Sequence, residues 1–406
     1  MSNLKKIVLV ALFLGIIYAV PVTQAILDLA AGDSPQVIEL FREAPTEKHL
    51  RSFEADLEDY SFFEETVRPP FQLVRYFAMG DMGAKALAGR DNWYFFQTGV
   101  RYLTEPYFRD LPGVKIQASG TVVGSGDADT QKGGDPVEII ADFAGQMNER
   151  GIKLLIVIMP GKAGIYPDKL SRWVAPATPV YKNSIRFMDE LRKKGVESLD
   201  IHTLLTAERK AADSRGEPLY MTTDTHVSGL GVRLVAAAIA ARVKQEPWYQ
   251  ELEHRRRYVR NETIVSRPGD IPRMTRLPLQ EFLFPAETTR CYQVSDSESG
   301  ELYTDGDSPI LMLGDSFSRV FQTDEPGAAG IIANLAYELQ LPLSSIVNDG
   351  GASTLVRQQL ARKTDLLAGK RLIIWEFVER DIRFGMRGWQ IISFAAEAAE
   401  TKTHGD

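Results

Sequence analysis

The sequence predicts an α/β fold in which a parallel sheet is covered by helices on both faces. Short, mainly apolar segments such as 152–160 and 371–378 have the composition of strands that are buried on both sides. Segments with the apolar spacing of amphipathic helices separate these strands. Strands that alternate with helices form parallel sheets, and ligands then bind beyond the carboxyl ends of the strands.

The first 25 residues predict export from the cytoplasm. Two lysines precede an uncharged apolar run from Ile7 to Val22, which is the pattern of a signal peptide. Small residues at Thr23 and Ala25 suit a cleavage site, but the run is also nearly long enough to stay in the membrane. We therefore expect residues 1–25 to be a signal peptide or a signal anchor.

Composition narrows the classes of function. The formal net charge is −7 at pH 7, whereas general nucleic-acid binders carry a basic surface, so we expect no nucleic-acid partner. The chain has one cysteine, Cys291, which excludes an intramolecular disulfide. Packing must therefore stabilise the core.

The other predicted elements follow one another along the chain. Residues 26–85 have the pattern of polar amphipathic helices, interrupted at APTEK and VRPP. Residues 86–390 form the predicted α/β domain, with an insertion of loops and short strands at about 245–308, and residues 391–406 form a polar tail. Turn residues and helix caps such as Asp135 bound the elements of the domain. The expected strands are 89–99, 152–160, 196–201, 309–313, 343–347 and 371–378, and the expected helices are 135–151, 179–195, 228–245, 327–340 and 352–369.

Polar segments follow the predicted strands at the places where a parallel sheet binds its ligands. Residues 161–167 (GKAGIYP), 314–319 (GDSFSR) and 379–383 (ERDIR) each come directly after an apolar strand. A fourth segment, 220–231 (YMTTDTHVSGLG), precedes a helix for which Ser228 is the expected N-cap. We expect the four segments to meet at one edge of the sheet.

Ser316 is the candidate nucleophile. It follows an apolar strand and Gly314, which permits a tight turn, and main-chain N–H groups at the start of the next helix can stabilise an oxyanion. Taken alone, however, Gly-Asp-Ser is more often a simple turn. The sequence around Ser316 is not Gly-x-Ser-x-Gly, so it is not the nucleophile elbow of the α/β-hydrolases.

A serine nucleophile needs a base, and His226 is the candidate among five histidines. Asp224 lies two positions before it, so its carboxylate can accept a hydrogen bond from one imidazole nitrogen while the other nitrogen faces Ser316. The same Asp-x-His spacing also occurs in capping arrangements and in metal sites that have further ligands. Both motifs stand where an α/β chain places its ligand site, which favours a Ser-His-Asp site.

The segments LMLGDSF and DTHVS resemble the SGNH-hydrolase-like acetyltransferases of the alginate O-acetylation family, the AlgJ and AlgX group. In that family an Asp-x-His block precedes the Gly-Asp-Ser block, whereas ordinary SGNH esterases have the serine early, so the motif order is permuted. The resemblance extends from GRDNWYFF through MPGKAGIYPDKL to WEFVERDI, over about residues 86–390. Val227 stands where the family commonly has tryptophan, which argues against sugar stacking at that position.

The resemblance implies an SGNH-hydrolase-like fold in which Ser316 accepts the acetyl group, His226 is the general base and Asp224 orients it, without a cofactor or a metal ion. It also implies a periplasmic protein, with or without a tether to the inner membrane, that acetylates hydroxyls of an alginate-like exopolysaccharide. The implied partners are the polysaccharide acceptor, a multipass membrane O-acyltransferase as acetyl donor, and other exopolysaccharide secretion proteins.

Four further residues at the expected edge are candidate substrate-binding groups. Lys162 and Tyr166 either hold the acceptor sugar or cover the edge of the sheet. Arg380 either binds a uronate carboxylate through two hydrogen bonds or pairs with a neighbouring glutamate. Asn348 either donates to the oxyanion or shapes its loop.

Two alternative functions are compatible with the same residues. One is a carbohydrate acetyl esterase, because exclusion of water decides between transfer and hydrolysis. The other is a non-catalytic polysaccharide-binding subunit of an envelope secretion complex. The intact set of Asp224, His226 and Ser316 argues against the latter.

Overall fold

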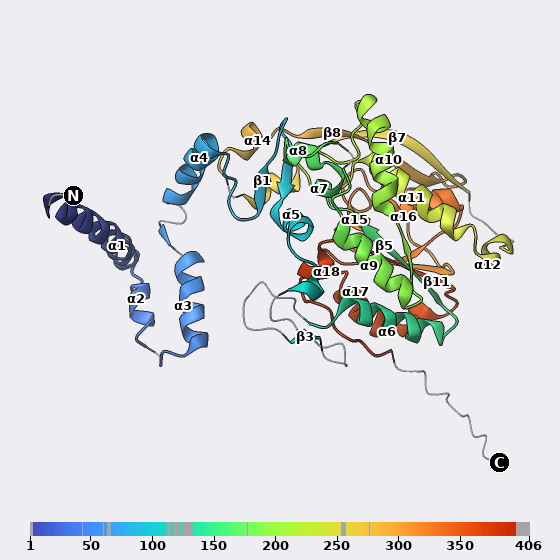
Figure 1. The fold of residues 1–406 in the computed structure, drawn as a ribbon, viewed down its shortest axis with the longest axis horizontal. Coiled ribbons are helices and arrows are strands. Elements are labelled where there is room, and N and C mark those ends of the chain that lie inside the picture. Colours follow the sequence, from blue (N-terminus) through green and yellow to red (C-terminus); the bar gives the residue numbers. More distant parts are fainter. Residues whose placement is uncertain are drawn as a thin grey trace, which may run out of the picture. The chain divides into compact units, whose positions relative to one another are not determined.

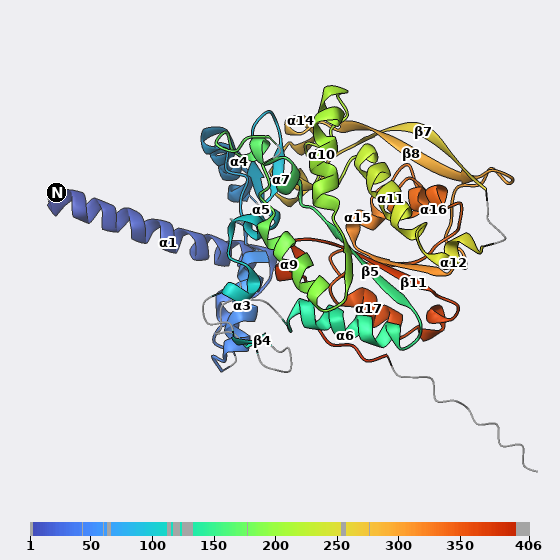
Figure 2. The same ribbon diagram turned by 45° about the vertical axis from the view of Figure 1, so that its right-hand side comes forward.

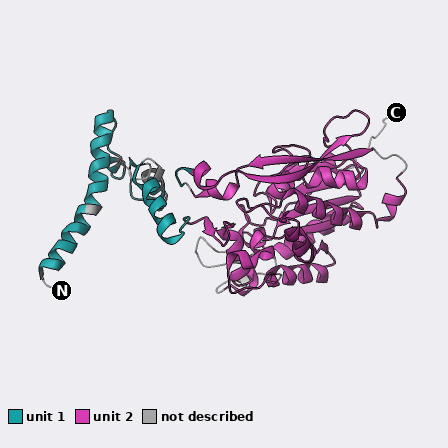
Figure 3. Cartoon of the chain, turned by 90° about the horizontal axis from the view of Figure 1, so that it is seen from above, with its two compact units in different colours: residues 1–83, 276–279 teal, residues 84–275, 280–406 magenta. Residues whose placement is uncertain are grey.

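The computed structural model describes residues 3–42, 44–59, 61–62, 66–111, 115–116, 122–123, 133–176, 178–252, 257–275 and 277–394. The chain forms two compact units, residues 1–83 with 276–279 and residues 84–275 with 280–406 (Figure 3). The greater part of the expected polar tail lies outside the described residues.

The first unit contains helices. Its longest helix, α1, is long and apolar enough to cross a membrane over Leu4–Ala31, a property that signal sequences share. α4 ends at Gly80, whose positive φ of 67° gives the left-handed turn that commonly stops a helix. The helices are α1 (Asn3–Ala31), α2 (Gln36–Glu39), α3 (Glu47–Asp59) and α4 (Arg68–Met79).

A five-stranded sheet in the order β10-β9-β11-β5-β6 lies at the centre of the second unit, and all its neighbouring strands are parallel. Every residue of β9 and β11 is buried, as expected for mainly apolar strands when helices cover both faces of a sheet. This sheet confirms the predicted α/β fold. The strands are β5 (Lys153–Met159), β6 (Glu197–Leu199), β9 (Ile310–Gly314), β10 (Ser344–Val347) and β11 (Leu372–Val378).

Helices pack on both faces of the sheet (Figures 1 and 2). In both views α6 and α17 lie together on one side, and α11 and α16 lie together on the other. α9 packs on α6, and α10 packs on α11. The predicted caps Asp135 and Ser228 are confirmed, because their side chains accept from main-chain N–H groups of α6 and α11. These helices are α6 (Pro136–Asn148), α9 (Lys182–Lys193), α10 (Ile201–Ser214), α11 (Gly229–Val243), α16 (Ile331–Leu339) and α17 (Leu355–Ala361).

The segment predicted as an insertion forms no strand of the central sheet within its described part. Its main feature is an antiparallel hairpin of β7 and β8, which packs on α11 and α16. Cys291 and Val294 of β8 are fully buried in this contact layer. The elements are α12 (Pro247–Gln250), β7 (Tyr258–Arg267), α13 (Asp270–Met274), α14 (Gln280–Leu283) and β8 (Glu287–Asp296).

The remaining elements are short and lie mostly at the ends of the larger ones. β1 and β2 form an antiparallel pair, and so do β3 and β4. The bounds are β1 (Ala86–Ala88), β2 (Tyr94–Phe96), α5 (Gln97–Thr104), η2 (Phe108–Asp110), β3 (Lys115–Ile116), β4 (Val122–Val123), α7 (Lys162–Ile165), α8 (Pro167–Leu170), α15 (Ser316–Arg319), η3 (Thr364–Leu367) and α18 (Asp381–Phe384).

Candidate active site

Each residue of Gly-Asp-Ser has a structural role in the turn that carries Ser316. A Cβ on Gly314 would lie 2.2 Å from Ser318 Oγ, so only glycine fits at the end of β9. Asp315 Oδ1 accepts from Phe317 N at 2.8 Å and caps α15, while its Oδ2 accepts from Val378 N at 2.9 Å and ties β9 to the end of β11. Ser316 is thus the first residue of the following helix, at the carboxyl edge of the sheet.

A second carboxyl group, that of Glu376 on the neighbouring strand β11, supports the same turn. Glu376 on β11 is fully buried, and its Oε2 accepts from Asp315 N at 3.2 Å and from Ser318 Oγ at 2.5 Å. Burial, assisted by the charge of Asp315, raises the pKa of Glu376 well above its usual range. This shift favours the uncharged carboxyl, which supports the turn through the two hydrogen bonds that it accepts.

Ser316, His226 and Asp224 form a continuous chain of hydrogen bonds. His226 Nε2 is 2.8 Å from Ser316 Oγ, and His226 Nδ1 is 2.6 Å from Asp224 Oδ1. The same carboxylate oxygen accepts from the main-chain N of His226 at 3.0 Å, which fixes the Asp-x-His turn. Asp224 is fully buried, and only 6% of the surface of His226 is exposed. This is the nucleophile, base and orienter geometry of a Ser-His-Asp triad.

Asp224 and His226 stabilise each other's charged forms. Burial opposes the charge of Asp224, but the charge and hydrogen bond of His226, with Arg267, outweigh burial and lower the pKa of Asp224. Burial also opposes protonation of His226, but Asp224 and then Asp270 outweigh it and raise the pKa of His226, against the positive charge of Arg380. The imidazole can therefore hold a proton taken from Ser316.

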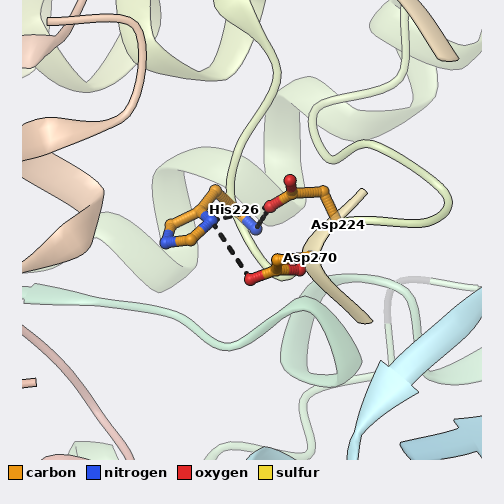
Figure 4. A group of neighbouring side chains, drawn as sticks. All are labelled: Asp224, His226 and Asp270. Carbon is orange, nitrogen blue, oxygen red and sulfur yellow. Dashed lines mark hydrogen bonds and ion pairs between the residues drawn. The ribbon is translucent and has the colours of Figure 1, made fainter. Parts of the chain in front are cut away.

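Asp270 is a group that the sequence did not identify. Its Oδ2 lies 3.6 Å from His226 Nδ1, and its two oxygens accept from Thr225 N at 2.7 Å and from Thr225 Oγ1 at 2.5 Å. Figure 4 shows the two carboxylates beside the same imidazole. A Cβ on Gly269 would meet Thr223 O at 2.1 Å, so α13 can begin this close only after glycine. Pro-Gly-Asp at 268–270 looks like an ordinary turn and gave no signal in the sequence.

The spacing of these groups does not suit a metal ion. Asp224, His226 and Asp270 each offer a possible ligand atom, and these atoms lie within 4.8 Å of one another. Two ligands of a tetrahedral metal ion, each about 2.1 Å from it, lie about 3.4 Å apart. His226 Nδ1 and Asp224 Oδ1 are 2.6 Å apart, which is the distance of a hydrogen bond. The arrangement is therefore that of a hydrogen-bonded acid and base.

Lys162 and Glu287 hold the segment that leads to the triad. Lys162 is buried, and its Nζ donates to the carbonyl oxygens of Met221, Thr222 and Asp224 at 2.7–3.0 Å. Burial lowers the pKa of Lys162 to about 7, although nearby carboxylates oppose the shift. Glu287 at the start of β8 accepts from both the N–H and the hydroxyl of Thr222, and likewise of Thr223. The insertion thus contributes directly to the position of Asp224.

Of the four predicted substrate-binding residues, Lys162 and Tyr166 are buried and bonded to other protein groups, and Asn348 lies beside the nucleophile turn. Lys162 uses its three donors on protein carbonyls, and Tyr166 is buried, donates to Asp213 Oδ1 and accepts from Leu219 N. Both placements favour the alternative in which these side chains cover the sheet edge. Asn348 N donates to Gly314 O at 3.0 Å, so this residue lies beside the nucleophile turn.

Arg380 lies near the triad and is partly exposed. Its guanidinium lies over the ring of Phe96, 5.1 Å from the ring centroid. Together with Thr225 and Lys162 it lines a small cavity of about 20 Å³. Among the described residues no ion pair to Glu376 or Glu379 is recorded, and Glu379 instead bonds Gly161 N, Ser184 and His202. The lack of either pair within the described part of the chain favours the uronate alternative for Arg380.

Asp270→Asn is expected to move the acid limb of the pH–rate profile to lower pH. Asp224 and Asp270 favour the protonated form of His226 and Arg380 opposes it, so loss of the Asp270 charge lowers the pKa of His226 and keeps the base form at lower pH. The measurement is the rate of acetyl-ester turnover against pH. Glu262→Gln is the control, because it also removes one carboxylate charge, but from an exposed side chain of β7 that pairs with Arg290. An unchanged profile for Asp270→Asn, or an equal shift in the control, would contradict a local charge effect of Asp270.

Comparisons with known proteins bear on the fold and the chemistry. The family model of the SGNH hydrolase-like domain, acetyltransferase AlgX, matches residues 126–379. The probable alginate O-acetylase AlgJ of Pseudomonas aeruginosa is 25% identical over 291 residues, which are 66% of this chain and 70% of the relative. The protein of that name from Azotobacter vinelandii is 27% identical over 242 residues, 56% of this chain and 58% of the relative.

Two solved structures have the same fold. The O-acetyltransferase domain of Pseudomonas putida AlgJ superposes with a TM-score of 0.53 at 18% identity, covering 74% of this chain and 92% of that one. Pseudomonas aeruginosa AlgX superposes with a TM-score of 0.50 at 17% identity, covering 72% of this chain and 62% of that one. The SGNH-hydrolase-like fold predicted for the domain is therefore confirmed.

Proposed function

Because the chain belongs to the AlgX family of SGNH hydrolase-like acetyltransferase domains, we propose that it moves acetyl groups onto hydroxyls of an alginate-like exopolysaccharide through an acetyl-Ser316 intermediate. The observation that carries the proposal is the hydrogen-bonded chain from Asp224 through His226 to Ser316 at the carboxyl edge of the sheet. Relatives named as probable alginate O-acetylases support the acceptor class.

The first half of the reaction acetylates Ser316. Ser316 Oγ attacks the carbonyl carbon of the acetyl donor while His226 Nε2 takes the hydroxyl proton, and Asp224 stabilises the imidazolium that forms. The main-chain N–H of Ser316 at the start of α15, with Asn348 beside the turn, is the proposed oxyanion site. The donor's leaving group then receives the proton from His226.

The second half of the reaction transfers the acetyl group from Ser316 to the sugar. A sugar hydroxyl attacks the acetyl-Ser316 carbonyl and gives its proton to His226, which returns it to Ser316 Oγ as the ester bond to the serine breaks. In the proposed setting the protein is exported, acts in the periplasm and receives acetyl groups from a multipass membrane O-acyltransferase alongside other secretion proteins. The apolar helix α1 supports export.

Acceptor dependence tests the proposal. The detergent-solubilised chain is given an activated acetyl ester with and without oligouronates, and the acetylated sugar and free acetate are both quantified. We expect acetylated oligouronate to be the main product when acceptor is present. Acetate release that is unaffected by acceptor, without acetylated sugar, would instead identify an acetyl esterase.

Arg380→Gln is expected to raise KM for oligouronates about tenfold or more, because a charge-assisted hydrogen bond contributes about 1.5–3 kcal/mol. KM for neutral oligosaccharides should change much less, because they have no carboxylate for the guanidinium. Arg387→Gln, at an exposed arginine seven positions later in the chain, is the control. Equal effects of Arg380→Gln on charged and neutral acceptors would contradict binding of the carboxylate.

A further inference from the structure

Helix α4 of the first unit has one face that packs on the protein and one that does not. On the packed side, Gln72 is buried and donates to Asp81 O at 3.1 Å, and Arg75 pairs with the Asp81 carboxylate. These contacts fix the rotation of the helix about its own axis. The opposite side is exposed.

The exposed side is continuously apolar. At 100° per residue its five members fall within an arc of about 120°. The exposed fractions are 60% for Phe71, 62% for Val74 and 68% for Phe77, which are large for such side chains in a folded protein. We call this surface the α4 apolar face; its residues are Pro70, Phe71, Val74, Phe77 and Ala78.

The start of α4 is tied to the end of α1. Phe62 N donates to Gln24 Oε1 at 2.8 Å. Gln24 follows the uncharged apolar run from Ile7 to Val22 by two residues, so it lies close to the boundary of the hydrocarbon when that run crosses a membrane. Arg68 comes six positions after Phe62, so α4 begins within about 20 Å of that boundary.

We propose that the α4 apolar face lies in the surface of the membrane that α1 crosses, with the helix parallel to the bilayer plane. The sequence of α4 contains arginines and no acidic residue, which suits the headgroup region of a bilayer with anionic lipids. The arc of about 120° is the width expected for a helix whose apolar side enters the headgroup and acyl boundary. The short connection between Phe62 and α4 keeps the α4 apolar face close to the headgroup region of the bilayer.

The test compares two labelled positions on opposite sides of one helix. The full chain is reconstituted into vesicles of zwitterionic and anionic phospholipids, carrying Phe77→Cys or Met79→Cys with a polarity-sensitive thiol label. Phe77 and Met79 are equally exposed in the protein, at 68% and 70%, but only Phe77 lies on the apolar face. Cys291 is fully buried, and burial raises its pKa to about 12, so the native thiol does not compete for label.

We expect the label at 77 to report an apolar environment and to be quenched by brominated acyl chains, most by chains brominated near the glycerol end. The label at 79 should report water and stay unquenched. Adding Phe71→Glu should return the label at 77 to water, because a charge does not enter the acyl boundary without cost.

Three results would overturn the proposal. The two labels could behave alike, the chain could fail to float with the vesicles, or the label at 77 could be in an apolar environment that brominated lipids do not quench. The last result would assign the face to a second copy of the chain or to another protein. This experiment does not involve the triad, so its outcome is independent of the proposed acetyl transfer.

Discussion

Ser316→Ala is expected to abolish the acetyl adduct and to lower acetyl transfer by about 10³-fold or more, because only binding and oxyanion stabilisation remain when a nucleophile is removed. The substitution removes one oxygen atom from the first residue of α15. The cap made by Asp315 and its bond to Val378 do not involve the Ser316 side chain, so the turn should keep its shape. The measurements are adduct formation by mass and product formation with an oligouronate acceptor.

Ser318→Ala is the matched control for this experiment. Ser318 stands two residues later on the same short helix, and its hydroxyl donates to Glu376 at 2.5 Å. Loss of that hydrogen bond should lower the free energy of unfolding by about 1 kcal/mol while leaving the adduct intact. Activity that survives in Ser316→Ala, or an equal loss in both variants, would contradict the role given to Ser316.

Asp224→Asn is expected to lower the rate of acetyl transfer by about 10³- to 10⁴-fold, the effect seen when the orienting acid of a Ser-His-Asp triad becomes an amide. The amide cannot stabilise the imidazolium, and its NH₂ group can favour the wrong tautomer of His226. Asp224 is also the largest favourable influence on the pKa of His226, so the base should be protonated less readily. The measurement is the rate of adduct formation at saturating acetyl ester.

Asp270→Asn serves as the comparison for Asp224→Asn. Both substitutions remove a carboxylate near His226, at 2.6 Å for Asp224 and 3.6 Å for Asp270. Of the two carboxylates, only Asp224 accepts the hydrogen bond from His226 Nδ1. Asp224→Asn should therefore lower the pH-independent rate much more than Asp270→Asn does. Equal losses would mean that the two carboxylates act on His226 through charge alone.

The fold could be predicted from the sequence because its strands are unusually clear. β9 and β11 are buried on both faces, so their sequences are apolar except at Glu376. The helices that cover the sheet have caps such as Asp135 and Ser228. The same regularity placed Ser316 and His226 at one edge of the sheet. The two motifs come together because strand ends and helix starts converge there.

The supporting groups could not be predicted, because tertiary packing decides where they point. Lys162 stands at the expected strand end, yet its side chain turns inward to three carbonyls rather than outward to a ligand. Asp270 and Glu287 lie in the segment that fits the strand-and-helix alternation poorly, and their approach to residues 222–225 depends on the path of the β7–β8 hairpin. Periodicity carries no information on such long-range contacts.

The most direct test of an acetyl-serine intermediate is a pulse and chase followed by mass. The full chain is exposed briefly to an activated acetyl ester, freed of excess ester and divided, and one half receives oligouronate. The account predicts one acetyl group on the peptide that contains Ser316, which disappears with acceptor as the same amount of acetyl appears on the sugar. Acetylated sugar formed at full rate without an adduct on Ser316 at any time would contradict it.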